Sequence, residues 1–175
     1  IMDGNVRWAK TKGNQRIFGH KNGVKAVRDT VEVAAEIGVK FLTLYAFSTE
    51  NWSRPKQEVD ALMSLLVSTI NSETDTLIKN NVRLLTIGDI NGLPKGVSNN
   101  LNELIKKTAN NTGLSLVLAL NYSARWEIVN AVKQIVKEFE KNPFNVSEIT
   151  NKVLEKTLNT HEMQKPTLLT EQNGY

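Results

Sequence analysis

The chain has 175 residues, with 22 lysines and arginines against 18 aspartates and glutamates, 40% hydrophobic residues and no cysteine. These values are ordinary for one globular domain, and the lack of cysteine excludes disulfides, thiolate catalysis and iron–sulfur clusters. The net charge of +4 and the isoelectric point near 9.3 are compatible with an anionic ligand, an acidic membrane surface or nucleic acid, and select none of them.

The apolar stretches of the sequence are only a few residues long, far below the ~20 residues of a membrane-spanning helix, and no signal peptide is apparent. The basic residues form no continuous run, and no zinc-finger or other nucleic-acid-binding motif is present. We therefore expect a soluble, cytoplasmic protein with no nucleic-acid partner.

Helix and strand patterns alternate along the chain. Apolar residues at helical spacing, as at Val59, Leu62 and Met63, predict the helices, and short apolar runs such as 114–120 predict buried strands. The predicted elements in chain order are helix 24–37, strand 39–47, helix 59–79, strand 82–87, a helix around 101–105, strand 114–120, helix 128–139 and a short helix over 148–158.

This alternation predicts parallel strands joined by right-handed crossovers. The fold class is therefore α/β, with an open, mostly parallel sheet flanked by helices on both faces, in a single domain over residues 1–175. Ligands of such sheets bind beyond the carboxyl ends of the strands, so polar segments that follow strands are candidate sites.

The first candidate segment, 3–9, has a carboxylate, a glycine, an amide and an arginine within five positions. Gly4 lets the backbone approach a ligand closely, and Arg7 offers several donors to phosphate oxygens. Asp3 is a natural Mg²⁺ ligand, because this ion takes one or two carboxylates together with phosphate oxygens. On composition alone, a solvated turn in which Asp3 caps a helix is an equally good interpretation.

The second candidate segment, 13–23, contains three glycines together with Arg16, His20 and Lys21. This composition suits a loop wrapped around an anion. A lone histidine is more often structural than catalytic, so the role of His20 stays open at this point.

The third candidate segment, 46–55, directly follows a predicted strand. Its polar and aromatic side chains are Ser48, Thr49, Glu50, Asn51, Trp52 and Arg54. A tryptophan in a polar loop is normally buried against something. Trp52 therefore either packs against the end of the sheet or lines an apolar path for the substrate, and we favour the second interpretation.

The sequence lacks the phosphate loop of NTPases, the dinucleotide-binding glycine motif, the serine-hydrolase elbow and the zinc-protease helix motif. Phosphate recognition without a nucleotide motif is the interpretation that is left.

Five sequence blocks occur in a fixed order: Met2-Asp3-Gly4-Asn5-x-Arg7-Trp8-Ala9, Arg16-x-x-Gly19-His20-x-x-Gly23, Leu44-Tyr45-Ala46-Phe47-Ser48-Thr49-Glu50-Asn51-Trp52-x-Arg54-Pro55, Ile87-Gly88-Asp89, and Asn121-Tyr122 with Arg125-Trp126. In this order and spacing the blocks resemble the signatures of the cis-prenyltransferases, above all the bacterial undecaprenyl diphosphate synthases. The resemblance extends from the start of the chain to about residue 139.

The resemblance implies an undecaprenyl diphosphate synthase-like fold and a Mg²⁺-dependent condensation of farnesyl diphosphate with isopentenyl diphosphate. The product would be a cis-polyprenyl diphosphate, a lipid carrier for cell-wall glycan synthesis. The resemblance also implies a homodimer and peripheral contact with a membrane through the product.

Residue roles are implied by the same resemblance. Asp3 would hold Mg²⁺ and assist departure of the diphosphate, and Asn51 would occupy the position of the proton acceptor. The allylic diphosphate would be bound by Gly4, Asn5, Arg7, Arg16 and His20, with Val6 and Trp8 beside them. The loop that orders the substrates would contain Ser48, Thr49, Glu50, Trp52 and Arg54. The helices 24–37 and 59–70 would form the walls of an apolar channel.

The sequence departs from the family pattern at three places. Val6 is β-branched where the family has a small or polar residue, which disfavours a positive φ in the phosphate turn. Ser123-Ala124 replaces a glycine-containing pair. Thr167 stands in place of an aspartate, and no arginine follows Arg125, so the Arg-x-x-Gly-Glu segment of the family is not in this sequence and the C-terminal part of the fold is expected to be incomplete.

These departures leave a competing hypothesis. It is a non-catalytic homologue that binds an allylic diphosphate or acts as a partner subunit. A generic phosphate-binding α/β domain is a more distant third.

Overall fold

The computed structural model describes residues 4–161 and 163. Its helices and strands are α1 (Asn5–Thr11), α2 (Arg16–Glu36), β1 (Phe41–Ser48), η1 (Thr49–Ser53), α3 (Lys56–Lys79), β2 (Arg83–Ile87), η2 (Ile90–Gly92), α4 (Lys95–Thr108), β3 (Ser115–Tyr122), α5 (Ala124–Lys141), η3 (Val146–Glu148) and α6 (Asn151–Thr157). Within this part of the chain, no helix is long and apolar enough to cross a membrane.

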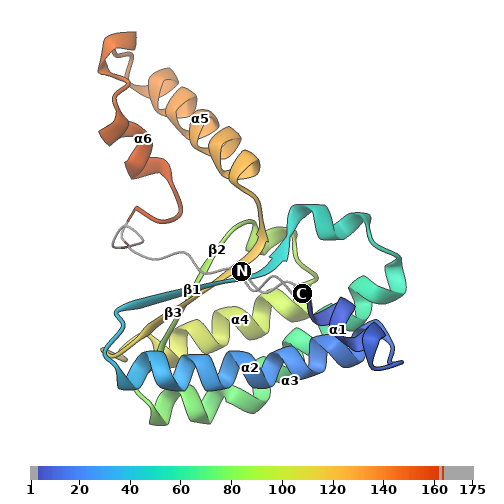
Figure 1. Cartoon of the computed structure of the whole chain (residues 1–175). Coiled ribbons are helices and arrows are strands. Elements are labelled where there is room, and N and C mark those ends of the chain that lie inside the picture. Colours follow the sequence, from blue (N-terminus) through green and yellow to red (C-terminus); the bar gives the residue numbers. More distant parts are fainter. Residues whose placement is uncertain (1–3, 162, 164–175) are drawn as a thin grey trace.

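Three parallel strands form the sheet in the order β1-β3-β2 (Figure 1). β3 lies in the middle between both other strands, and its residues Val117 and Leu120 are fully buried. Leu120 belongs to the cluster that the helices cover, and Val117 to the cluster on the other face. The parallel pairing and the α/β class confirm the prediction from the sequence. The strand bounds differ from the predicted ones by one or two residues.

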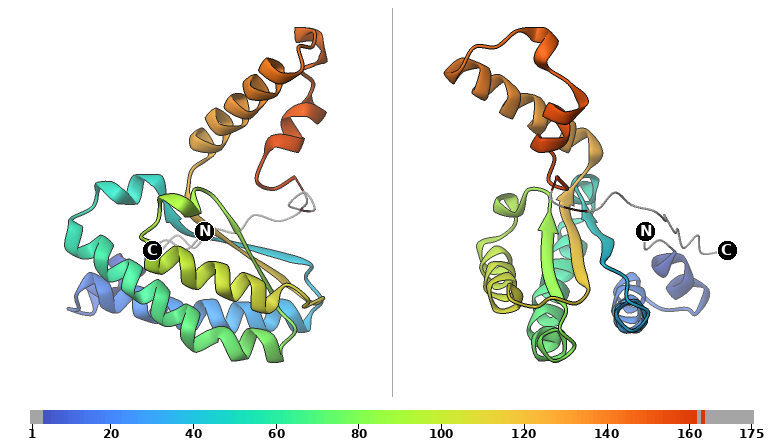
Figure 2. Two further views of the ribbon diagram at one scale, coloured as in Figure 1. Left: turned by 180° about the vertical axis from the view of Figure 1, so that it is seen from behind. Right: turned by 90° about the vertical axis from the view of Figure 1, so that its left-hand side faces the viewer.

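Helices α2, α3 and α4 pack on one face of this sheet (Figures 1 and 2). The main core lies between these helices and the sheet, and includes Val31, Ala34, Leu44, Met63, Leu84, Leu101, Leu116 and Leu120. The opposite face of the sheet has a smaller cluster around Ile87, Val117 and Ala119, which in the described part of the chain contains no residue of any helix. The prediction of helices on both faces is therefore met on one face only.

α5 and α6 extend away from the sheet as an arm (Figure 1). The buried Glu127 holds this arm to the end of β3, because its carboxylate accepts hydrogen bonds from the Tyr122 hydroxyl at 2.6 Å and from the Asn159 backbone N–H at 2.8 Å. Ser123 caps α5, since its hydroxyl accepts a hydrogen bond from the Trp126 N–H. Ser123, one residue of the pair that departs from the family pattern, thus begins the helix.

The segment 13–23 is not the predicted loop, because α2 already begins at Arg16. Gly19 and Gly23 are four residues apart and lie on the face of α2 that touches α1. A Cβ atom at Gly19 would lie 2.1 Å from the Asn5 carbonyl oxygen, and one at Gly23 would lie 2.8 Å from Asn5 Nδ2. The two glycines therefore serve close packing of the helices instead of the flexibility of a loop.

The segment 3–9 also differs from the predicted turn. From Asn5 onward it forms α1, and Gly4 at the start of this helix takes the left-handed conformation with φ of 87°. Val6 lies inside the helix and has no positive φ. The β-branch of Val6 is therefore not placed in a left-handed backbone conformation. Asp3 lies outside the described residues.

The contact between α1 and α2 can be tested by adding one methyl group. We expect Gly19→Ala to lower the free energy of unfolding by about 1–3 kcal/mol or more, because the new Cβ overlaps a backbone oxygen. Gly96→Ala is the matched control. Gly96 is also helical and has open space around it, so Gly96→Ala should raise the free energy of unfolding by about 0.5–1 kcal/mol. Urea unfolding followed by circular dichroism measures both, and equal effects of the two variants would contradict the prediction.

Candidate active site

A cavity of about 400 Å³ lies between α2, α3 and the carboxyl ends of β1 and β3. Five residues predicted from the sequence contribute to its polar lining: Asn5, His20, Ser48, Asn51 and Arg54. The rest of the lining is mostly apolar and includes Val24, Val27, Leu44, Phe47, Leu62, Met63, Leu66, Leu118 and Leu120. The cavity therefore combines a polar rim with an apolar body.

A second cavity of about 100 Å³ continues between the same two helices. It shares Val24, Val27, Thr69 and Leu118 with the first cavity, and apolar side chains make up most of its lining. This geometry agrees with the prediction that the helices 24–37 and 59–70 form the walls of an apolar channel.

Glu58, at the start of α3, holds the basic residues of the rim together. Its carboxylate accepts hydrogen bonds from Arg16 Nη1 and Arg54 Nη1, both at 2.9 Å, and its Oε1 lies 4.0 Å from His20 Nε2. Burial alone would raise the pKa of Glu58, but the hydrogen bonds and charges of Arg16 and Arg54 outweigh this and hold the pKa below its ordinary value. Glu58 is therefore a carboxylate at neutral pH.

His20 faces the same cluster as a neutral imidazole. Burial lowers the pKa of His20 below 6.5, and the positive charges of Arg54 and Arg16 lower it further, whereas Glu58 opposes the shift. Its Nε2 atom is buried and, among the described residues, has no hydrogen-bond partner. A buried ring nitrogen on the wall of a cavity is suited to hydrogen-bond a polar ligand there.

Asn51 is fixed by the turn that follows β1. Its Oδ1 accepts a hydrogen bond from the Ser48 N–H at 3.0 Å, which closes η1 back onto the end of the strand. The amide oxygen is thus engaged, while the amide group still lines the cavity. Since a carboxamide is not basic, Asn51 is suited to position a group and not to remove a proton.

Trp52 does not line the cavity. Its ring packs edge-on against Phe47 at 5.1 Å, and its Nε1 donates a hydrogen bond to Asn121 Oδ1 at 2.8 Å. Asn121 in turn donates from Nδ2 to the Asp89 carbonyl oxygen at 3.0 Å. Trp52 therefore packs against the end of the sheet, which is the alternative interpretation from the sequence, and it is not among the residues that line this cavity.

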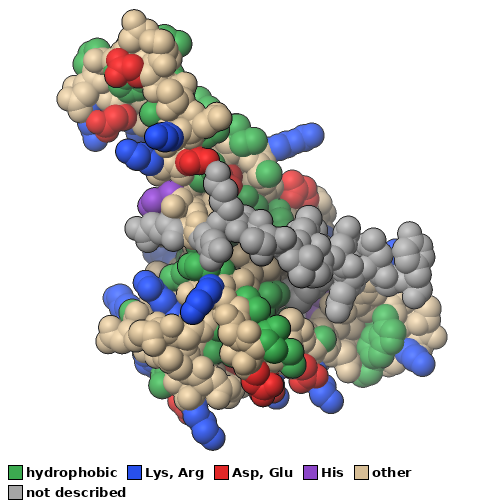
Figure 3. Space-filling model, turned by 60° about the vertical axis from the view of Figure 1, so that its left-hand side comes forward, with side chains coloured by type: hydrophobic (Ala, Val, Ile, Leu, Met, Phe, Trp, Pro, Cys, Tyr) green, Lys and Arg blue, Asp and Glu red, His purple; other side chains and the backbone are tan. Residues whose placement is uncertain are grey.

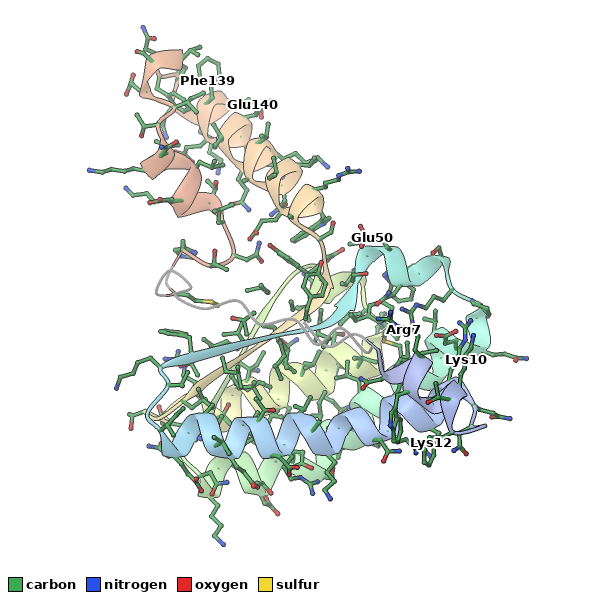
Figure 4. The ribbon with its side chains drawn as sticks, viewed as in Figure 1. Arg7, Lys10, Lys12, Glu50, Phe139 and Glu140 are labelled. Carbon is green, nitrogen blue, oxygen red and sulfur yellow. The ribbon has the colours of Figure 1, made fainter. Side chains whose placement is uncertain are left out.

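The remaining predicted residues lie around the rim. Gly4 caps α1, and Val6 lies half-buried in that helix. Arg7 and Trp8 are exposed on α1, with Trp8 stacked on Phe18, and Thr49 and Glu50 belong to η1 (Figure 4). None of these six is among the residues that line the cavity.

Two residues of the site were missed by sequence reasoning. Glu58 follows Arg54 by four residues, a helical spacing that signals an ion pair, but its contact with Arg16 spans 42 residues. Asn121 was recognised only as part of a motif, and no local pattern pairs it with Trp52.

The described residues contain no group of three or more histidine, aspartate or glutamate side chains that would hold a metal ion.

A family model described as putative undecaprenyl diphosphate synthase matches residues 1–174. The chain belongs to this family. The resemblance predicted from the five sequence blocks is thereby confirmed.

Relatives of known name agree with this assignment. The chain is 47% identical over 174 residues to a ditrans,polycis-undecaprenyl-diphosphate synthase ((2E,6E)-farnesyl-diphosphate specific) of Pasteurella multocida, with 99% of this chain and 72% of that protein covered. It is 48% identical over 174 residues to an isoprenyl transferase of Clostridium tetani, with 99% and 68% covered.

Solved structures share the fold. The structure of lavandulyl diphosphate synthase from Lavandula x intermedia, in complex with dimethylallyl diphosphate, superimposes with a TM-score of 0.89 at 29% identity, covering 94% of this chain and 70% of that one. A probable undecaprenyl diphosphate synthase from Campylobacter jejuni has a TM-score of 0.68 at 36% identity and covers 78% and 63%.

The role of Glu58 in this prenyltransferase-family site can be tested by pH. Since its folded pKa lies below the ordinary 4.5, its charge stabilises the fold above that pH, and this contribution is lost as the pH falls through the folded pKa. We expect Glu58→Gln to be less stable than wild type at pH 7, and the difference to shrink in acid. Urea unfolding at a series of pH values measures this difference.

Glu103→Gln is the matched control, because Glu103 pairs only with the exposed Lys107 on α4. Removing the charge of Glu103 should change the free energy of unfolding very little at any pH. A difference between wild type and Glu58→Gln that stays constant down to acid pH would contradict the assigned role.

The Trp52–Asn121 contact can be tested with glycine, because Asn121 has a φ of 48° that glycine adopts without strain. We expect Asn121→Gly to lower the free energy of unfolding by about 1–3 kcal/mol, because the Trp52 N–H loses its hydrogen-bond partner. The fluorescence emission of Trp52 should shift to longer wavelength. The emission is measured with Trp8 and Trp126 replaced by Phe.

Asn81→Gly is the control for this substitution, because Asn81 has a similar φ of 55° but lies far from the site, beside Thr112. It should leave the Trp52 emission unchanged. The same spectral shift in both variants would show that Asn121 acts only through general stability.

Proposed function

We propose that this protein is a cis-type prenyl transferase, which condenses an allylic diphosphate such as farnesyl diphosphate with isopentenyl diphosphate. The observation that carries the proposal is the single cavity that joins a basic rim to an apolar body. An allylic diphosphate has the same two parts, a dianionic or trianionic head and a hydrocarbon tail. Membership of the family and the names of the relatives support the same reaction.

The rim suits the diphosphate. Arg16 and Arg54 each use part of a five-donor guanidinium on Glu58, so each retains N–H groups for phosphate oxygens. His20 adds an imidazole nitrogen that has no partner among the described residues. These groups stabilise the charge that develops on the diphosphate when its bond to the allylic carbon breaks, and they do so more in the transition state than in the ground state.

The apolar body suits the isoprenoid tail. A volume of about 400 Å³ lies within the usual range of roughly 300–1,000 Å³ for pockets that enclose a small ligand. Branched and unbranched aliphatic side chains from α2 and α3 surround it, so the tail is removed from water. The second cavity, which shares four lining residues with the first, gives the lengthening chain a direction along these two helices.

The new carbon–carbon bond forms as the diphosphate leaves, and one proton is then lost from the isopentenyl unit. Asn51 holds its amide at the cavity but does not take the proton, because a carboxamide is a poor base. We assign the proton to the departing diphosphate or to water, with Asn51 positioning it.

Mg²⁺ is part of this proposal, with Asp3 as the carboxylate ligand. When bound, the ion would neutralise charge on the diphosphate and ease its departure. A homodimer, a cytoplasmic location and peripheral contact with a membrane through the lipid product belong to the proposal as well.

The test is incubation of the chain with farnesyl diphosphate, labelled isopentenyl diphosphate and Mg²⁺, with the products separated by length. We expect chain extension that requires Mg²⁺. Asp3→Ala and His20→Ala should each lower kcat/KM by roughly 100-fold or more, the usual cost of losing a group that stabilises a transition-state charge. Lys95→Ala, on the exposed start of α4, is the control and should leave the rate unchanged.

Extension without Mg²⁺, or an unaffected Asp3→Ala variant, would sink the proposed mechanism. Calorimetric titration with farnesyl diphosphate separates the competing hypothesis: tight binding without turnover indicates a non-catalytic homologue, whereas neither binding nor turnover leaves only a generic phosphate-binding domain.

A further inference from the structure

A basic surface runs over α1 and the first half of α2. From Gly4 to Arg28 the sequence has seven lysines and arginines and no aspartate or glutamate: Arg7, Lys10, Lys12, Arg16, Lys21, Lys25 and Arg28. This segregation of charge is unusual for a chain that has 18 acidic residues in all. On the face shown in Figure 3, by contrast, acidic and basic side chains are interspersed over the arm and the helical layer.

Only part of this charge is neutralised from other elements. Arg16 pairs with Glu58, and Arg28 pairs with Glu73, both across to α3. Lys10, Lys12, Lys21 and Lys25 are exposed, and within the described part of the chain none of them forms an ion pair. These four lysines therefore project a positive potential into solvent.

An exposed aromatic pair lies within the same surface. Trp8 on α1 and Phe18 on α2 stack with their ring centres 5.7 Å apart, yet they remain 43% and 39% exposed. Lys12 follows Trp8 by four residues, and Lys21 and Lys25 follow Phe18 by three and seven, so each lysine lies on the same helix face as its aromatic neighbour. We call these five residues, together with Lys10, the α1–α2 basic surface; its six members are Trp8, Lys10, Lys12, Phe18, Lys21 and Lys25.

The two helices hold this surface rigidly. The close approach at Gly19 and Gly23 fixes α1 against α2, so the aromatic pair and the lysines keep their relative positions without a ligand. Lys10 and Lys12 lie along α1 at the end of the molecule remote from the α5–α6 arm (Figure 4). The surface is thus unobstructed by the arm.

We propose that the α1–α2 basic surface docks on an anionic lipid bilayer. Lysines around exposed tryptophan and phenylalanine are the composition of interfacial membrane-binding segments: the cations meet anionic headgroups, and the rings enter the boundary with the acyl chains. A nucleic acid fits less well. Its bases need free aromatic faces, and Trp8 and Phe18 each cover one face of the other.

The surface and the cavity share the same stretch of α2. His20 and Val24 line the cavity, while Phe18, Lys21 and Lys25 lie on the same turns of the helix but do not line it. The proposal rests on the membrane contact included in the proposed function and names the surface that makes it, while the docking itself does not depend on catalysis.

The test is co-sedimentation of the full chain with vesicles of phosphatidylcholine alone or mixed with phosphatidylglycerol. We expect binding to the mixed vesicles only, weakened by salt and not displaced by inorganic phosphate at constant ionic strength. Replacing Lys10, Lys12, Lys21 and Lys25 with Glu should weaken binding at least ~100-fold, because each lysine near an anionic surface contributes roughly fivefold. Phe18→Ser should weaken it without any change in charge.

The matched control carries the same change of charge elsewhere, as Lys40→Glu, Lys95→Glu, Lys133→Glu and Lys137→Glu, and should still bind. Equal loss in both quadruple variants, or equal binding to both kinds of vesicle, would overturn the proposal. So would tighter binding of a single-stranded oligonucleotide with the same dependence on the four lysines. The vesicles contain no diphosphate substrate, so this result is separate from any failure of the proposed activity.

Discussion

The close packing of α1 against α2 is the constraint on which the rest of the site depends. The Asn5 carbonyl lies where the side chain of any residue larger than glycine at position 19 would begin. This contact places Asn5 on the wall of the cavity and sets α2 so that Arg16 and His20 face the start of α3. A short helix of seven residues has little stability of its own, so its position comes from this tertiary contact.

Glu58 is the second contact on which the site depends. Its carboxylate allows several cationic side chains to lie close together. Arg16 and Arg54 would repel each other, and the Glu58 carboxylate that both of them hydrogen-bond offsets that repulsion. The same cluster keeps His20 neutral, because the two guanidinium groups and burial together outweigh Glu58. The rim is thereby ready for an anionic ligand before the ligand arrives, which reduces the reorganisation that binding requires.

The sequence was sufficient to predict the parallel α/β sheet and five of the residues around the cavity, because apolar periodicity and motif order are local signals. It failed at contacts between distant segments. Gly19 and Gly23 resembled loop residues, since nothing local shows that α1 packs against them. The Arg16–Glu58 and Trp52–Asn121 contacts span 42 and 69 residues, so only the folded chain reveals them. Trp52 was assigned to the substrate path for the same reason.

The carboxyl edge of the sheet unites these distant contacts. β1 leads directly into η1, β2 leads into the loop that contains Asp89, and β3 carries Asn121 as its second-last residue. Asn121 accepts a hydrogen bond from Trp52 of η1 and donates one to the Asp89 carbonyl oxygen. The left-handed backbone of Asn121 turns its side chain between the two loops, at a conformation that asparagine tolerates better than most residues. Since η1 contributes Asn51 to the cavity, the middle strand fixes the geometry of a loop that lies on another strand. The side-chain amide of Asn121 therefore links the middle strand to the loop that shapes the polar rim of the cavity.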